Sequence, residues 1–315
     1  MQQSELRLLH SLRTISRYSI LFGIIVSIAL TNLGSFPLEA QVVLALIALT
    51  IGIPHGAVDH LITVPKLTGI KMLLFLAGYL AVVALAVLFI LNQNTLGFQI
   101  VVLMSAVHFG IGDAAFVSEI DRREETKKSW PKLVFAFASG FTPVVFPLVN
   151  SQSAEALNRV KPTLVDWVGD LGPIFFATMV SLAITSVLVM LILKRWQEAI
   201  DLTLLISLAL VAPPLVAFAF YFGLWHALRH TGRLTLELDS AKLKHQAGKL
   251  RQAFAKAFLA GIPALIITLL GTLVLGMSQG FKFNQDYLWY LLVVIWALTV
   301  PHMALTARLD AKALA

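Results

Sequence analysis

The chain has 315 residues, of which 58% are hydrophobic and only 13% carry a charge. Soluble domains carry about a quarter charged residues, so this composition excludes an ordinary soluble globular protein. The net charge of +7 comes with no repeat of basic and aromatic residues, which argues against nucleic acid as a partner and favours a lipid bilayer. Cysteine is absent, so disulfides, thiolate metal sites and iron–sulfur clusters are excluded.

Nine apolar runs follow one another along the chain, and most approach the roughly 20 residues that a helix needs to cross a bilayer. Their ranges are 18–36, 40–60, 72–91, 97–117, 132–149, 173–193, 202–230, 256–277 and 286–306. Backbone groups in lipid must be paired within each helix. The sequence therefore predicts an all-α, polytopic transmembrane bundle that forms a single integral-membrane domain over residues 1–315.

Three stretches depart from plain spanning helices. The run 132–149 is short and contains one glycine and two prolines, which interrupt a helix. The stretch 150–172 has the mixed polarity of an amphipathic helix. The run 202–230 has a Pro-Pro pair near its centre, so we expect one long helix that kinks there.

Loop charge predicts the topology, because Lys and Arg gather on the cytoplasmic side of a membrane. If all nine runs crossed from a cytoplasmic N-terminus, the basic segment 231–255 would lie outside the cell. If the run 132–149 does not cross, about eight helices cross, and the segment 1–17, the segment 231–255 and the C-terminus are all cytoplasmic. We therefore expect a multi-pass protein of the cell membrane with both termini in the cytoplasm.

Six of the eight histidines lie within or at the ends of apolar runs. Ionisable side chains inside a membrane are costly and usually mark a function. In the topology above, the second, fourth, seventh and ninth runs cross in the same direction, so their histidines reach one depth. A single buried histidine is more often a hydrogen-bonded core residue, but six at one depth favour a metal centre. The six are His55, His60, His108, His226, His230 and His302.

Four of these histidines are the candidate metal ligands. His226 and His230 are four residues apart and share one face of a helix. His108 is the deepest in its run, where an unpaired imidazole would be hardest to justify. His55 stands in the sequence PHG, where a locally opened helix leaves room for an ion.

Four further residues are expected to support the ligands. Asp59, one turn beyond the first ligand, and Asp113, on the helix of the second, are expected to orient the imidazole rings. The alternative for both carboxylates is helix capping or an ion pair with a nearby arginine. His60 and His302 are expected to be hydrogen-bond partners of the ligands, and each remains an alternative ligand.

Imidazoles without thiolate suit Fe, Cu or Zn. Four neutral nitrogens leave one or two positions open on a dication, which suits Fe(II) that binds O₂. A site inside the bilayer favours an apolar substrate from the lipid, and we expect nearby aromatic residues to line its slot, although for each alone packing or lipid contact is the commoner role. These aromatic residues are Phe109, Phe141, Phe146, Phe220, Tyr221, Phe222 and Trp225.

Four motifs carry a resemblance that covers residues 40–306, namely GIPHGAVDH, SAVHFGIGD, APPLVAFAFYFGLWHALRH and TVPHMALT. They resemble the Brp/Blh family of membrane-bound β-carotene 15,15′-dioxygenases. The resemblance implies an enzyme that uses Fe(II) and O₂ to cleave the central double bond of β-carotene into two molecules of all-trans-retinal, with delivery of retinal to a rhodopsin-type protein. The iron ligands that it implies are His55, His108, His226 and His230.

Two other classes remain as alternatives. A membrane di-iron desaturase or hydroxylase needs about eight histidines in HxxxH and HxxHH clusters, whereas this chain has one HxxxH and no HH pair. A transporter commonly has duplicated halves, and no internal repeat is visible here. A retinoid-binding membrane protein that forms a Schiff base needs a buried lysine, and the apolar cores contain none.

Overall fold

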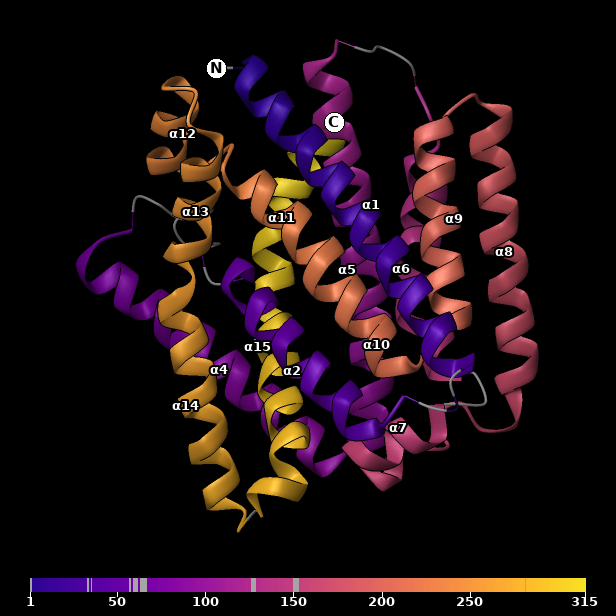
Figure 1. The fold of residues 1–315 in the computed structure, drawn as a ribbon. Helices are drawn as coiled ribbons and strands as arrows, with labels where there is room; N and C mark the ends of the chain where they lie inside the picture. Colours follow the sequence, from indigo (N-terminus) through magenta and orange to yellow (C-terminus); the bar gives the residue numbers. More distant parts are fainter. Residues whose placement is uncertain are drawn as a thin grey trace.

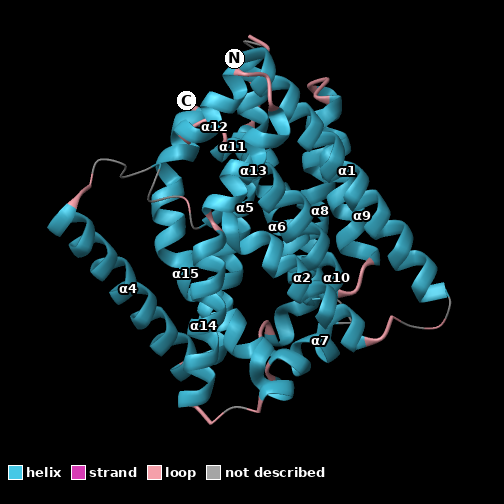
Figure 2. Ribbon diagram, turned by 60° about the vertical axis from the view of Figure 1, so that its left-hand side comes forward, coloured by secondary structure: helices cyan, strands magenta, loops and turns pink. Residues whose placement is uncertain are grey.

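The computed structural model describes residues 2–32, 34, 36–56, 58, 62, 67–125, 129–149, 153–280 and 282–315. Asp59 and His60 lie outside these residues, so the expectations for them stay predictions. Every regular element in the described ranges is a helix, which confirms the predicted all-α class (Figure 1; Figure 2). The helices are α1 (Gln2–Asn32), α2 (Leu38–Gly56), α4 (Gly69–Asn92), α5 (Asn94–Arg123), α6 (Lys132–Val149), α7 (Ser153–Val160), α8 (Gly172–Ile192), α9 (Trp196–Val211), α10 (Pro214–Phe218), the π-helix η3 (Ala219–His226), α11 (Ala227–Leu234), α12 (Asp239–Gln246), α13 (Leu250–Ala260), α14 (Ile262–Ser278) and α15 (Phe283–Leu314), with short 3₁₀ turns at Pro162–Leu164 and Gly169–Leu171.

Eight helices in the described part of the chain are long and apolar enough to cross a membrane, which confirms the polytopic bundle. The helix α6 is one of them, although its prolines led us to expect that it would not cross. The helix α4 leans outward from the rest (Figure 2), and Ile90 is its only buried residue among those described. Its other apolar side chains are therefore available to lipid.

The expectation of one kinked helix over 202–230 is wrong. The helix α9 ends at Val211, and Ala212 and Pro213 are extended, with ψ of 142° and 151°. The second proline of the pair holds its predecessor in the extended region, and neither proline can donate a helical hydrogen bond. The chain therefore reverses, and α10, η3 and α11 run back through the bundle as one rod (Figure 1).

This reversal changes the number of times that the chain passes through the bundle, on which the predicted topology depends. It adds one passage of the chain through the bundle, so α6 can cross while both termini still lie at the same end (Figure 1). The basic helix α12 lies at this end too, as the charge argument requires, and the amphipathic helix α7 lies at the other end. The rod of α10, η3 and α11 packs against α1 and α2.

Glycines on α5 and α6 bring the backbones of these two helices into direct contact. A Cβ atom built on Gly110 would collide with the carbonyl oxygen of Ala136, and one built on Gly140 would collide with the carbonyl oxygen of Ala106. Only hydrogen fits at either position, so backbone meets backbone. This contact fixes the depth of α5, which carries one of the predicted metal ligands.

We predict that Gly140→Ala destabilises the protein by about 1–3 kcal/mol, because the added methyl group forces α5 and α6 apart. Gly271→Ala on α14 is the matched control, since nothing lies within 4 Å of its Cβ position. Alanine gains up to about 1 kcal/mol over glycine in a helix, so the control should be neutral or stabilised. Thermal unfolding of both variants in detergent measures this, and equal stability of the two would contradict the prediction.

Candidate metal centre and adjoining cavity

Five histidines from distant parts of the chain meet inside the bundle. His55 lies in the last turn of α2, His108 in α5, His226 at the end of η3, His230 in α11 and His302 in α15. All five side chains are buried. Each ring centre lies 4.9–6.4 Å from the ring centres of at least three of the others. The structure thus brings together the four predicted ligands and adds His302 at the same level.

The spacing of the rings fits a shared ion. Imidazoles that bind one metal at a metal–nitrogen distance of about 2.1 Å have ring centres roughly 4.5–5.2 Å apart. Two of the observed distances, 4.9 and 5.1 Å, lie in this range, and the others extend from 5.3 to 6.4 Å. Within the described residues, no group of three or more such side chains has its donor atoms set to hold an ion as they stand. Binding therefore requires the rings to move inward by a small amount, and the ligand set stays a prediction.

The hydrogen bonds of the histidine nitrogens support the same fit. His226 Nε2 and both ring nitrogens of His230 are buried without a hydrogen-bond partner, whereas buried polar atoms are nearly always paired. His55 Nδ1 bonds the carbonyl oxygen of Gly52, which fixes the ring and leaves Nε2 for a metal. The Nε2 atoms of His108 and His302 are 3.1 Å apart, a separation that suits a hydrogen bond or two neighbouring ligands of one ion.

Three glycines make room for the imidazoles and their neighbours. A Cβ atom on Gly112 would lie 3.3 Å from the ring of His226, and one on Gly56 would lie 3.3 Å from His302 Nδ1. A Cβ atom on Gly52 would collide with the ring of Phe222. The motifs around the predicted ligands are rich in glycine because the rings pack directly on the backbone.

The role expected of Asp113 is corrected by its hydrogen bonds. Its carboxylate accepts bonds from Trp225 Nε1 at 3.0 and 3.1 Å and from the Tyr221 hydroxyl at 3.4 Å, and not from His108. Five residues of helix turn the side chain by roughly 140°, so Asp113 and His108 point to different faces of α5. Asp113 instead holds the π-helix that ends in His226.

A second contact that holds this part of the chain, formed by Arg229 and Trp225, lies beside His230. The sequence analysis did not identify it. The Arg229 guanidinium stacks 3.3 Å from the centre of the Trp225 ring, and its Nε donates to Ser16 Oγ at 2.9 Å. Trp225 and Arg229 directly precede His226 and His230 in the chain. Their contacts with α1 and α5 therefore fix the backbone from which both predicted ligands project.

The charge of Arg229 is balanced by Asp201, which is completely buried on α9. Asp201 lies 3.5 Å from Arg229, 3.0 Å from Arg13 and 2.6 Å from Arg17. These charges stand at the ends of apolar runs, which is the signal that could have revealed them. A charged residue at that depth needs a partner from another helix.

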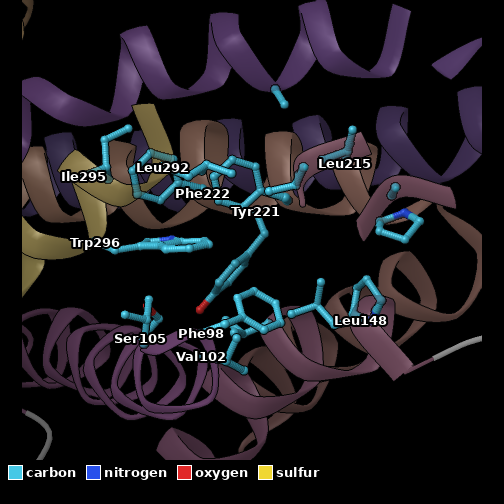
Figure 3. Close-up of a pocket in the computed structure, with 18 of the residues that line it drawn as sticks. Phe98, Val102, Ser105, Leu148, Leu215, Tyr221, Phe222, Leu292, Ile295 and Trp296 are labelled. Atoms are coloured by element: carbon cyan, nitrogen blue, oxygen red, sulfur yellow. The ribbon is translucent and has the colours of Figure 1, made fainter. Parts of the chain in front are cut away.

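An apolar cavity of about 140 Å³, partly open to its surroundings, lies one helical turn from the histidines. Its walls come from α2, α5, α6, α7, the α10–η3 rod and α15. Figure 3 shows Phe98, Val102 and Ser105 of α5 on one side and Leu292 and Ile295 of α15 on the other. The apolar lining of this slot suits a hydrophobic ligand.

The predicted aromatic lining is only partly found in this cavity. Phe109, Tyr221 and Phe222 line it. The other four lie elsewhere: Phe141 stacks on Phe137, Phe146 packs on Phe176, Phe220 packs on Phe22 and Trp225 stacks under Arg229. Phe109 and Phe222 also lie beside the histidine cluster, because their ring centres are 4.2 Å from His226 and 5.9 Å from His55.

Comparison with known proteins gives one family. Residues 46–310 match the family described as "Beta-carotene 15,15'-dioxygenase". A relative named "Beta-carotene 15,15'-dioxygenase" from uncultured marine bacterium 66A03 is 28% identical over 262 residues, which cover 81% of this chain and 88% of that protein. A relative from Halobacterium salinarum, named "Probable beta-carotene 15,15'-dioxygenase Blh", is 26% identical, with 95% of this chain and 94% of that protein covered. No solved structure matches.

We predict that Asp201→Ala destabilises the protein by about 3–5 kcal/mol, because it leaves buried arginines without their shared counter-ion. Thr203→Ala, two residues along the same helix at an exposed position, is the control. The yield of folded protein in detergent and the midpoint of thermal unfolding measure the effect. If Asp201→Ala unfolds at the same temperature as the control, the network does not stabilise the site.

Proposed function

The chain belongs to the beta-carotene 15,15'-dioxygenase family, and from this premise we propose that it cleaves the central double bond of β-carotene with O₂ and one Fe(II) ion into two molecules of all-trans-retinal. The observation that carries the proposal is an apolar cavity that ends against five buried histidines. The central C=C bond breaks, and each of its two carbons takes one atom of O₂ as an aldehyde oxygen. The reaction then balances without a further reductant.

In this proposal, His55, His108, His226 and His230 hold the iron through ring nitrogens that face the cluster. The bound Fe(II) supplies the one-electron chemistry that O₂ requires to react with a hydrocarbon. His302 supports His108 through the contact between their Nε2 atoms. Four neutral imidazoles would leave the charge of a bound Fe(II) ion intact.

The protein's own contribution is to hold the polyene and to exclude water from it. Phe109 and Phe222 lie between the cavity and the imidazoles, where they can press a flat conjugated chain against the metal site. The lining is almost wholly hydrocarbon, so shape and not a polar clamp binds the substrate. A dry cavity also protects reactive intermediates from hydrolysis.

Lipid is the proposed route for both substrate and product. A polyene comparable in length to the roughly 30 Å apolar layer of a bilayer dissolves there and not in water. The surface of α4 presents apolar side chains along its whole length, as a lipid-facing helix does. We place the protein in the cell membrane with both termini on the cytoplasmic side, because the basic helix α12 lies at the same end as the termini. We also propose that retinal passes on to a rhodopsin-type protein.

We predict that His108→Ala abolishes retinal formation and lowers bound iron from about one atom per chain to a small fraction, because a ligand is lost. His10→Ala is the matched control, since His10 is exposed and pairs with Glu124 at the end of the bundle. Co-expression with a β-carotene pathway, product chromatography and elemental analysis give the result. Full activity of His108→Ala would defeat the assignment, and two metal atoms per chain would favour the di-iron alternative.

We predict a smaller effect for His302→Ala, because a residue that positions a ligand typically changes metal affinity or activity by about 10–100-fold. The variant should still bind iron when Fe(II) is added in excess, and activity should then partly return. His302→Gln, which keeps a hydrogen-bond donor near His108, should retain more activity than His302→Ala. Complete loss of iron from His302→Ala at saturating Fe(II) would make His302 a ligand.

A further inference from the structure

The cavity has two unlike ends. Toward the termini it reaches Phe109 and Thr299, which lie beside or one turn from the histidines. At the opposite end of the bundle part of its wall comes from the short helix α7, which lies at the base (Figure 1). Ala156, Leu157 and Val160 of α7 are buried and line the cavity. The remainder of α7 is amphipathic, with exposed residues on its outer side.

The depth of the cavity can be counted along its walls. Phe98 near the base and His108 at the metal centre are ten residues apart on α5, which is about 15 Å at 1.5 Å per residue. Leu288 and His302 on α15 are fourteen residues apart, which is about 21 Å. Half of a polyene that is as long as the roughly 30 Å apolar layer of a bilayer is about 15 Å. One half of the substrate therefore fills the space between α7 and the histidines.

The end of the cavity at α7, its base, also differs in polarity from the end beside the histidines. The hydroxyl groups of the lining belong to Ser105, Tyr221 and Thr299, each within about five residues of a histidine along its helix. The side chains that line the base are hydrocarbon. A hydrocarbon end ring fits there without an unpaired polar group, whereas a ring with a hydroxyl group would lose its hydrogen bonds.

We propose that α7 is the end stop of a molecular gauge, in which Ala156, Leu157 and Val160 seat the hydrocarbon end ring of the substrate and so select the double bond that faces the histidines. This inference rests on the proposed function and names what sets its regiochemistry. No polar group grips the polyene along the slot, so the distance to the end wall decides its register.

A bulkier end wall should shift the register. A larger side chain at position 156 holds the ring further from α7, so a double bond closer to that ring faces the histidines. Cleavage follows the same balance as before: that C=C bond breaks, and each carbon takes one oxygen atom of O₂. The products are then two unequal carbonyl compounds, one shorter and one longer than retinal, and a fragment cut at a methyl-bearing carbon of the polyene is a ketone.

The test is a graded series, Ala156→Val, Ala156→Leu and Ala156→Phe, with Ala154→Phe as the matched control on the exposed side of the same helix. Each full-length protein is co-expressed with a β-carotene pathway, and all aldehyde and ketone products are separated by chromatography. Iron content and thermal unfolding of each purified protein show whether it is folded. We expect the ratio of unequal carbonyl products to retinal to rise with side-chain size, by roughly tenfold or more in Ala156→Phe, and to stay at the wild-type value in the control.

The outcomes separate the gauge from the function that it serves. Folded, iron-containing Ala156 variants that release only retinal, or that lose activity without any unequal carbonyl product at any size, would overturn the gauge and leave the proposed function intact. A change in Ala154→Phe equal to that in Ala156→Phe would also overturn it. A wild-type protein that releases no aldehyde from β-carotene would overturn the proposed function and the gauge with it.

Discussion

The burial of five imidazoles at one level is the constraint on which the rest of the structure depends. A polar nitrogen without a partner in an apolar bundle is costly, and His226 and His230 together leave three such atoms. A fold that keeps this arrangement must compensate for it, and a shared ion would satisfy the unpaired nitrogens. The closely packed glycines of α5 and α6 and the glycines beside the rings serve this convergence, because they let backbones and imidazoles approach without intervening side chains.

The direction of the helices follows from the same constraint. The rod that carries His226 and His230 must run parallel to α2, α5 and α15 for its histidines to arrive at their level. The Pro-Pro break after α9 makes this possible, since it reverses the chain and sends the rod back toward the termini. The rod is then held by α5 through Asp113 and by α1 and α9 through Arg229, so its two histidines cannot drift along the bundle.

Local pattern was enough to predict most of the helices and the histidines that gather, because run length and residue spacing are properties of the sequence itself, but it missed the chain reversal within 202–230. It failed where the answer depended on pairing between distant segments. Asp113 was assigned to His108 on the same helix, whereas its partners Tyr221 and Trp225 lie more than 100 residues away. His302 was ranked below the ligands because no spacing links it to them, and Asp201 was overlooked because its three arginines come from other helices.

Buried ion pairs lie toward one end of the bundle and the apolar cavity lies toward the other, with the histidines between them. Toward the termini, Arg233 pairs with Asp310 at 2.6 Å, and the arginines around Asp201 are buried with their counter-ions. The charges at this end are paired within the protein. On the other side the cavity is lined mainly by hydrocarbon as far as α7. An apolar molecule is therefore the ligand whose chemistry matches the side of the histidine cluster on which the cavity lies.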